Sequence, residues 1–324
     1  MRKLVIVFVL IFLTTGCHSD EPYRETKFLF DTEVYIEAYG PNAENAVNKA
    51  MEKMAAIDQA ASFYSEDSEI ALLNQSAGKS AVQLSKDTFE LLEKSLEIAE
   101  STNGAFNPSL GPLVQIWQTA KTEEVIPAEE KILKLLPLVD YKKVVMDSDN
   151  LTAYLPEAGM SIDLGAITKG FAVEKGMNIL KEAGIESAMV RAGGNVYTIG
   201  KKANGDAWRV GIRNPLQLDK TIGYLEPKNQ VVDTSGNYEQ SFLIGGHEYG
   251  HIMNPRTGYP VEGITSCTII TEHPTLADAL STAVFVLGHE KGLSLIEGMP
   301  EVEGFMVGTD GVRYMSSGFE GLMK

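Results

Sequence analysis

The sequence predicts an α+β fold with mixed, mainly antiparallel sheets and packed helices. Apolar residues recur at helical spacing in several segments, most clearly over residues 43–57. Short segments of alternating character lie between the helices and end at glycine or proline, as at Gly40-Pro41. Strands and helices do not alternate as βαβ units, which disfavours a doubly wound parallel sheet. With 44% apolar residues among 324, the chain can bury a large core.

Each expected element rests on a local signal. Residues 28–39 alternate enough for a strand, and the apolar stripe of 43–57 indicates an amphipathic helix. A second helix runs from its Ser85 cap to Gly104. The remaining elements are, in chain order, short helices near 113–117 and after Pro127, strands near 143–147, 151–155 and 160–163, a helix over 168–183 ending at Gly184, strands near 187–192, 196–200 and 207–212, helices over 275–287 and 290–297, and a terminal hairpin turning at 309–311.

The first residues predict export and lipid attachment. Arg2 and Lys3 precede ten apolar residues, whose helix of about 15 Å is too short for a hydrocarbon layer of about 30 Å. Residues 1–16 therefore indicate a signal peptide. The ending L-T-T-G-C resembles a bacterial lipobox, so we expect a lipid on Cys17 and an extracytoplasmic place on the cell membrane. Ordinary cleavage nearby, which leaves Cys17 without a role, is the alternative.

Three regions follow from this interpretation: the signal peptide, a lipid-anchored tether over 17–26, and a single domain over 27–324. With Cys17 lipidated, Cys267 has no partner for an internal disulfide. The formal net charge of −16 argues against a nucleic-acid partner, because phosphate repels such a surface. An anionic substrate therefore needs local cations.

Residues 247–251 read H-E-Y-G-H and match the H-E-x-x-H pattern of zinc peptidases. That site requires a helix, in whose interior Gly250 would cost about 1 kcal/mol, and Pro255 follows closely. The sequence instead predicts a hairpin in which 242–244 pairs with 249–253 across G-G-H-E. We therefore reject the zinc-peptidase interpretation and keep His251 as a candidate for another role.

The segment S-I-D-L-G-A-I-T-K-G (161–170) delivers Asp163 to a glycine-containing bend just before a predicted helix. A helix N-terminus attracts phosphate, and Lys169 adds positive charge there. Asp163 as a simple turn or capping residue is the alternative reading.

The helix over 275–287 carries Asp278, Ser281 and Thr282 on one face. A carboxylate and two hydroxyls on a largely apolar helix suit Mg²⁺ or Ca²⁺ better than zinc. The alternative is a Thr282 hydroxyl bonded back to its own helix and an Asp278 paired with a lysine or arginine. The glycine pair of R-A-G-G-N (191–195) permits close backbone approach to a ligand, and a β-bulge is an equal alternative. N-P-R-T-G-Y-P (254–260) has the composition of a turn, and a purely structural turn braced by Arg256 is the alternative to a functional role.

These pieces occur in the order found in the ApbE family, the FAD:protein FMN transferases, which the chain resembles from about Lys27 onward. D-L-G-A-I-T-K-G-F-A-V resembles the family's D-L-G-x-I-A-K-G-Y-A-V, and A-D-A-L-S-T-A its A-D-A-L-x-T-A. R-A-G-G-N and H-I-M-N-P-R-T-G are similar to x-x-G-G-N and H-I-x-D-P-R-T-G. The chain departs from the family pattern with N-P-S at 107–109, F-D-T at 30–32, and Asn254 in place of Asp.

The resemblance implies an ApbE-like fold of two intimate halves with FAD between them. It implies Mg²⁺ held by Asp278, Thr282 and a backbone oxygen of Ala166, with Ser281 as a further candidate. The implied FAD contacts are Phe30, Tyr64, Ala105, Phe106, Asn107, Asp163, Lys169 and Ile252. Family members transfer FMN from FAD to a Ser or Thr hydroxyl of an exported acceptor protein and release AMP. The alternatives are an FAD pyrophosphatase and a non-catalytic flavin-binding lipoprotein.

Attack by a hydroxyl on the diphosphate requires a proton acceptor within reach. His251 titrates in the useful range and is the first candidate for this catalytic role, and Asp163 is the second. A structural histidine hydrogen-bonded within its hairpin is the alternative for His251.

Overall fold

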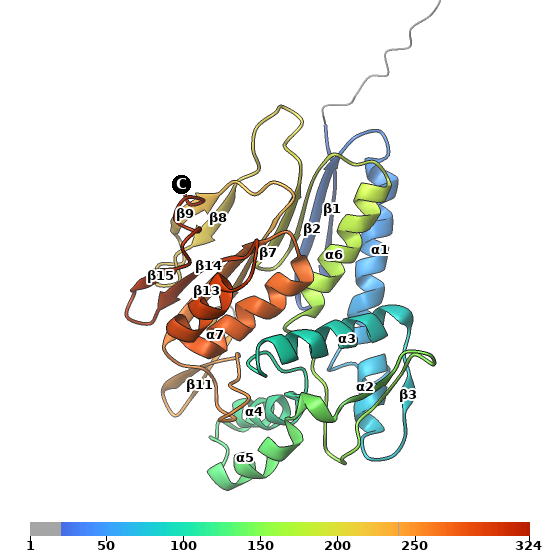
Figure 1. Cartoon of the computed structure of the whole chain (residues 1–324), viewed down its shortest axis with the longest axis vertical. Coiled ribbons are helices and arrows are strands. Elements are labelled where there is room, and N and C mark those ends of the chain that lie inside the picture. Colours follow the sequence, from blue (N-terminus) through green and yellow to red (C-terminus); the bar gives the residue numbers. More distant parts are fainter. Residues whose placement is uncertain (1–20, 239) are drawn as a thin grey trace, which may run out of the picture.

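A computed structural model describes residues 21–238 and 240–324 and has the mixed α+β architecture that the sequence predicts (Figure 1). Its centre is an antiparallel eight-stranded sheet with the order β1-β2-β6-β7-β10-β13-β14-β15. The strands are β1 (Tyr23–Leu29), β2 (Thr32–Tyr39), β6 (Ser187–Ala192), β7 (Asn195–Ile199), β10 (Val231–Gly236), β13 (Ile264–Thr271), β14 (Glu303–Gly308) and β15 (Arg313–Met315).

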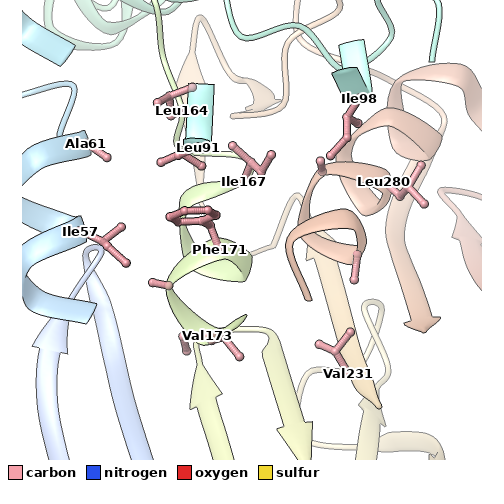
Figure 2. Packing of buried hydrophobic residues seen from close by; sticks show 14 of the residues in the cluster. Ile57, Ala61, Leu91, Ile98, Leu164, Ile167, Phe171, Val173, Val231 and Leu280 are labelled. Carbon is pink, nitrogen blue, oxygen red and sulfur yellow. The ribbon is translucent and has the colours of Figure 1, made fainter. Parts of the chain in front are cut away.

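Three long helices cover one face of this sheet: α1 (Ala43–Ala61), α6 (Thr168–Glu182) and α7 (Pro274–Glu297). Their apolar stripes meet in one core, in which Phe171 of α6 is fully buried. Figure 2 shows Phe171 between Ile57 of α1 and Leu280 of α7. The sheet and these helices therefore form the layer pair that carries the site described below.

Smaller elements surround this layer pair. The hairpin of β8 (Val210–Arg213) and β9 (Thr221–Leu225) packs on the other face of the sheet. The rest consists of α2 (Glu69–Gln75), α3 (Lys86–Ser101), α4 (Gly111–Glu123), α5 (Glu129–Leu135), the 3₁₀ turns Leu136–Leu138 and Tyr141–Lys143, a small sheet of β3 (Val82–Gln83), β5 (Thr152–Tyr154) and β4 (Val145–Asp147), and a hairpin of β11 (Ser241–Ile244) and β12 (His247–Gly250).

The single strand predicted over 28–39 is wrong, because the chain turns at Phe30 and Asp31 and forms two paired strands. Leu29 pairs with Thr32, and the turn residues have φ of 53° and 56°. Two left-handed residues match the twist of a tight hairpin, but Asn-Gly normally supplies them. Phe-Asp carries no such signal and holds a strained backbone in this place.

The tether predicted over 17–26 overlaps β1, whose first residue Tyr23 pairs with Ala38. The folded part therefore begins at or before Tyr23. Charged residues made this edge strand look like a linker, yet Arg24 lies 3.2 Å from Glu37 in an ion pair across the hairpin. The strand predicted over 160–163 is also absent; this segment runs extended beside 108–111, with the Asp163 N–H donating to the Pro108 carbonyl at 2.8 Å.

Two glycine-dependent predictions agree with the structure, and a third agrees in part. The helix over 274–297 is interrupted at Gly288, with φ of 75° and ψ of 176°, as the two predicted helices require. The terminal hairpin turns through Gly311, whose φ is 81°. The β11–β12 hairpin also forms, but its turn is Gly245-Gly246 alone, so Ile244 pairs with His247 and the predicted register was wrong.

Within the described residues, no helix combines the length and the apolar character that a membrane span requires.

Candidate active site

A cleft of about 900 Å³ collects residues from Phe30 to Thr282. Its walls come from the β1–β2 turn, the end of α1, α4, the start of α6, the β6–β7 turn, β10, the segment after β12, and α7. The structure brings to this cleft the following residues singled out by sequence: Phe30, Tyr64, Ala105, Phe106, Asn107, Asp163, Ala166, Lys169, His251, Ile252, Asp278 and Thr282. Cys17 lies outside the described residues.

The bend before α6 places Asp163 on the cleft wall. Its Oδ1 accepts a hydrogen bond of 2.8 Å from the N–H of Gly165, so the side chain also caps its own turn. Burial raises the pKa of Asp163, while the Gly165 N–H and the charge of Lys169 lower it. The first residues of α6, Thr168 and Lys169, line the same wall, so the positive end of the helix dipole and the Lys169 ammonium lie beside the cleft, where they favour an anion.

Asp278 and Thr282 lie one helical turn apart on α7 and both line the cleft. The Asp278 carboxylate is 2% exposed, accepts a 2.8 Å hydrogen bond from the Gly170 N–H through Oδ2, and lies 3.3 Å from Lys169 Nζ through Oδ1. One part of the alternative given in the sequence analysis is therefore correct, because Asp278 pairs with a lysine. Thr282, however, forms no hydrogen bond with any described residue, so its hydroxyl is not bonded back to the helix.

These donors fit a hard divalent cation. The Asp278 carboxylate, the Thr282 hydroxyl and the Ala166 backbone carbonyl all offer oxygen, and all three residues line the same cleft. Asp278 already holds a cationic group beside its Oδ1, namely the Lys169 ammonium. The wall therefore has the charge and the ligand type for Mg²⁺.

Ser281 is not brought to the cleft, in contrast to its place among the candidate metal ligands. It is fully buried, and its hydroxyl lies 2.6 Å from Asp233 Oδ2 and 2.7 Å from Ser235 Oγ, both on β10. Sequence reasoning missed Asp233. The only signal was one charged residue within the apolar start of a strand, V-V-D-T.

Gly170 allows α6 and α7 to approach closely enough for its N–H to reach Asp278. A Cβ at this position would overlap the Pro274 carbonyl oxygen and lie 2.7 Å from Asp278 Cβ. We expect Gly170→Ala to push the helices apart, to lower the free energy of unfolding by about 1–3 kcal/mol, and to weaken cation binding at Asp278. Urea unfolding followed by circular dichroism gives the first quantity and metal titration the second.

Gly176→Ala on the same helix is the matched control. The atom nearest to its Cβ would be Met54 Sδ, at 3.1 Å, which belongs to a flexible side chain. Alanine is the better helix former by about 1 kcal/mol at both positions. Equal stability of the two variants would contradict the close-approach role of Gly170.

His251 lines the cleft just after β12. Its Nδ1 lies 3.0 Å from the carbonyl oxygen of Gln240. A carbonyl only accepts, so Nδ1 carries the proton and Nε2 keeps its lone pair. Desolvation lowers the pKa of His251; the Gln240 carbonyl opposes this shift, and the charge of Lys169 adds to it. The imidazole is therefore neutral at neutral pH and competent to accept a proton.

The second histidine of the H-E-x-x-H match has a different setting. His247 starts β12, is exposed, and lies 3.4 Å from Glu262 at the surface. Both histidines come from a hairpin and its exit, as predicted, and not from one helix face. Among the described residues, no group of three or more His, Cys, Asp and Glu side chains is arranged to hold a metal.

An aromatic cluster closes one part of the cleft. Trp117 of α4 and Phe242 of β11 line it, and Trp117 donates a 2.8 Å hydrogen bond to the Gly258 carbonyl in the N-P-R-T-G segment. The Trp117 ring lies 5.3 Å from that of Tyr249. The 254–258 segment thus holds Trp117 in place, and the aromatic side chains form an apolar wall that suits a planar ring system.

The remaining predicted contacts have distinct positions. Asn107 is 7% exposed, and its Oδ1 accepts from the N–H and hydroxyl of Ser109, at 2.9 and 2.7 Å. Tyr64 is 64% exposed and belongs to the rim. Local cations that an anionic substrate needs are present: Lys121, Lys169, Arg191 and Arg213 line the cleft of this strongly acidic chain.

Comparison with known proteins agrees with this geometry. A curated FAD:protein FMN transferase of Treponema pallidum is 33% identical over 308 residues, covering 89% of this chain and 85% of its own length. The crystal structure of the ApbE protein of Thermotoga maritima matches with a TM-score of 0.86 and 33% identity, over 94% of this chain and all of that one. The flavin transferase ApbE of Vibrio cholerae matches with a TM-score of 0.83 and 26% identity, over 93% and 99%.

The family model of ApbE matches residues 30–306, which include every described cleft residue named above. From this match, the relatives and the shared fold, we conclude that the chain belongs to the ApbE family.

Proposed function

We propose that this chain transfers FMN from FAD to a Ser or Thr hydroxyl of an exported acceptor protein and releases AMP. The observation that carries the proposal is the convergence in one cleft of the start of α6, the Asp278 and Thr282 side chains of α7, and His251, whose Nδ1 faces the Gln240 carbonyl. The names of the relatives, FAD:protein FMN transferases, support the same reaction.

Asp278, Thr282 and the Ala166 carbonyl would hold Mg²⁺. When bound there, the ion neutralises charge on the diphosphate and polarises its phosphorus–oxygen bonds. Lys169 lies beside Asp278 and at the start of α6, from where its ammonium can bind a phosphate oxygen. This local positive charge offsets the repulsion that a protein with a net charge of −16 exerts on an anionic substrate.

His251 accepts the proton of the attacking hydroxyl. The hydroxyl oxygen bonds to the FMN-side phosphorus while the bond from that phosphorus to the bridging oxygen breaks. The proton passes to His251 Nε2, and AMP leaves with the bridging oxygen. Asp163 is the weaker candidate for this role, because its Oδ1 already accepts from Gly165.

We also propose that the protein is anchored by a lipid on Cys17 at the extracytoplasmic face of the membrane. The support is the signal-like residues 1–16 and the L-T-T-G-C ending. Cys17→Ala should move the protein from the membrane fraction to the soluble fraction; unchanged fractionation would contradict the anchor.

Incubation with FAD and Mg²⁺, with and without an exported acceptor carrying a Ser or Thr site, tests the reaction. A transferase yields AMP and an acceptor heavier by the mass of the FMN group, read by mass spectrometry. AMP and free FMN without any adduct indicate the pyrophosphatase alternative. Flavin binding with no AMP under either condition indicates the non-catalytic alternative.

A further inference from the structure

The charged residue beneath the cleft, Asp233, has no part in the proposed reaction. It lies in β10, is 1% exposed, and faces α7 together with Ser235, two residues further along the strand. Its register partners are Asn195 of β7 and Ile269 of β13. Burial of a carboxylate in this apolar layer costs free energy, so packing alone does not account for an acid here.

Asp233 is connected to α7 through the hydroxyl of Ser281. Ser281 Oγ lies 2.6 Å from Asp233 Oδ2 and 3.0 Å from the Asp278 carbonyl oxygen on its own helix. The hydroxyl has one proton and cannot donate fully to both acceptors. The carboxylate is both the nearer and the stronger acceptor, so the Ser281 proton favours Asp233 over the carbonyl of its own helix. Ser235 Oγ, at 2.7 Å, is the second contact of Ser281 on the same strand.

The turn of α7 over 278–282 is therefore held from two sides. On one side the Gly170 N–H of α6 donates to Asp278 Oδ2 at 2.8 Å. On the other side Ser281 is fixed to β10. Because Ser281 lies between Asp278 and Thr282 in the sequence, its position fixes the rotation of this turn about the helix axis. That rotation decides where the Asp278 carboxylate and the Thr282 hydroxyl enter the cleft.

We propose that Asp233 is a positioning residue for the cation-binding wall, acting through Ser281 on the α7 turn that carries Asp278 and Thr282. This inference rests on the cation binding of the proposed function. Removal of an outer partner of this kind weakens metal binding by about tenfold or more in metalloproteins. The same loss of cation affinity is expected whether Asp233 or Ser281 is replaced, because either change removes the hydrogen bond between them.

The test measures cation binding without turnover. Mn²⁺ is titrated into FAD-free full-length protein and read from the loss of the free-ion electron paramagnetic resonance signal, with Mg²⁺ displacement as a check. Asp233→Ala and Ser281→Ala should each weaken binding by about tenfold. The loss of affinity in the double variant should be smaller than the sum of the two single losses, because both variants remove the Asp233–Ser281 hydrogen bond. Asp233→Asn should restore most of the affinity, since its amide oxygen still accepts from Ser281.

Thr198→Val is the matched control, because Thr198 lies on β7 of the same sheet, outside the cleft lining, and the variant removes a buried hydrogen bond of 2.9 Å to the Pro227 carbonyl. It should leave Mn²⁺ binding unchanged. Wild-type affinity in both Asp233→Ala and Ser281→Ala, with binding intact in the parent, would overturn the positioning role alone. Additive losses in the double variant would overturn the Ser281 link. No Mn²⁺ or Mg²⁺ binding by the wild type would overturn the inference together with the metal part of the proposed function.

Discussion

Asp278→Asn is expected to lower the rate of FMN transfer by about a hundred- to a thousandfold and to remove its dependence on Mg²⁺. Asparagine keeps the shape of the side chain, and its Oδ1 can still accept from the Gly170 N–H. It lacks the negative charge that a divalent cation requires. AMP release from FAD, followed over a range of Mg²⁺ concentrations, measures the effect.

Glu174→Gln is the control for this variant. Glu174 also joins α6 to α7, by accepting from the Thr275 hydroxyl at 2.5 Å, but it lies outside the cleft lining. Glu174→Gln removes a negative charge from the same helix interface and so tests whether charge loss there has a general effect. This variant should keep the Mg²⁺ dependence of the wild type. Full activity of Asp278→Asn at ordinary Mg²⁺ concentration would remove Asp278 from the metal site.

His251→Ala is the second variant with a large expected effect. General-base catalysis contributes about a hundred- to ten-thousandfold, and the loss of transfer should fall in this range. FAD affinity should change little, because the diphosphate site that we propose consists of the α6 start and the Asp278 wall and does not include His251. Flavin fluorescence quenching measures binding, and acceptor mass measures transfer. Turnover equal to that of the wild type would leave His251 as a structural residue of its hairpin.

The pH dependence of transfer separates the two candidate bases. Desolvation lowers the pKa of His251 from 6.5, and a histidine that serves as the general base acts in its neutral form. Activity is therefore complete above this lowered pKa and falls as the pH drops through it. The pKa of Asp163 is raised from 3.8 by burial, so it also titrates on the acid side. If His251 is the base, the fall in the rate at low pH should disappear in His251→Ala. If the residual rate of this variant still falls over the same pH range, the titrating base is Asp163.

Periodicity and motif order predicted much of this molecule. The stripes of 43–57 and 168–183 specify helices because their apolar side chains repeat with the helical turn. The segments around Asp163, His251 and Asp278 converge in the fold although they are far apart in sequence. Their proximity was predicted from the family resemblance, since spacing within one chain contains no information on which distant segments meet.

The errors have local physical causes. Phe30 and Asp31 adopt the left-handed conformation without the glycine or asparagine that usually announces it, so a hairpin looked like one strand. Arg24 and its neighbours are polar because β1 is an edge strand, and polarity resembled a tether. Asp233 and Ser281 gave no pattern because their hydrogen bond joins a strand to a helix that follows it much later.

The cleft wall begins at Phe30 and ends at Thr282, so nearly the full length of the chain must be folded before a dinucleotide can bind. A bound ligand therefore raises the free energy of unfolding of the whole domain, and not only that of one local segment. At a ligand concentration one hundred times the dissociation constant, this added stability is about 2.7 kcal/mol. A fragment of the chain lacks part of the cleft and should not bind FAD. In the intact protein, FAD should raise the melting temperature, and unfolding should remain a single cooperative transition.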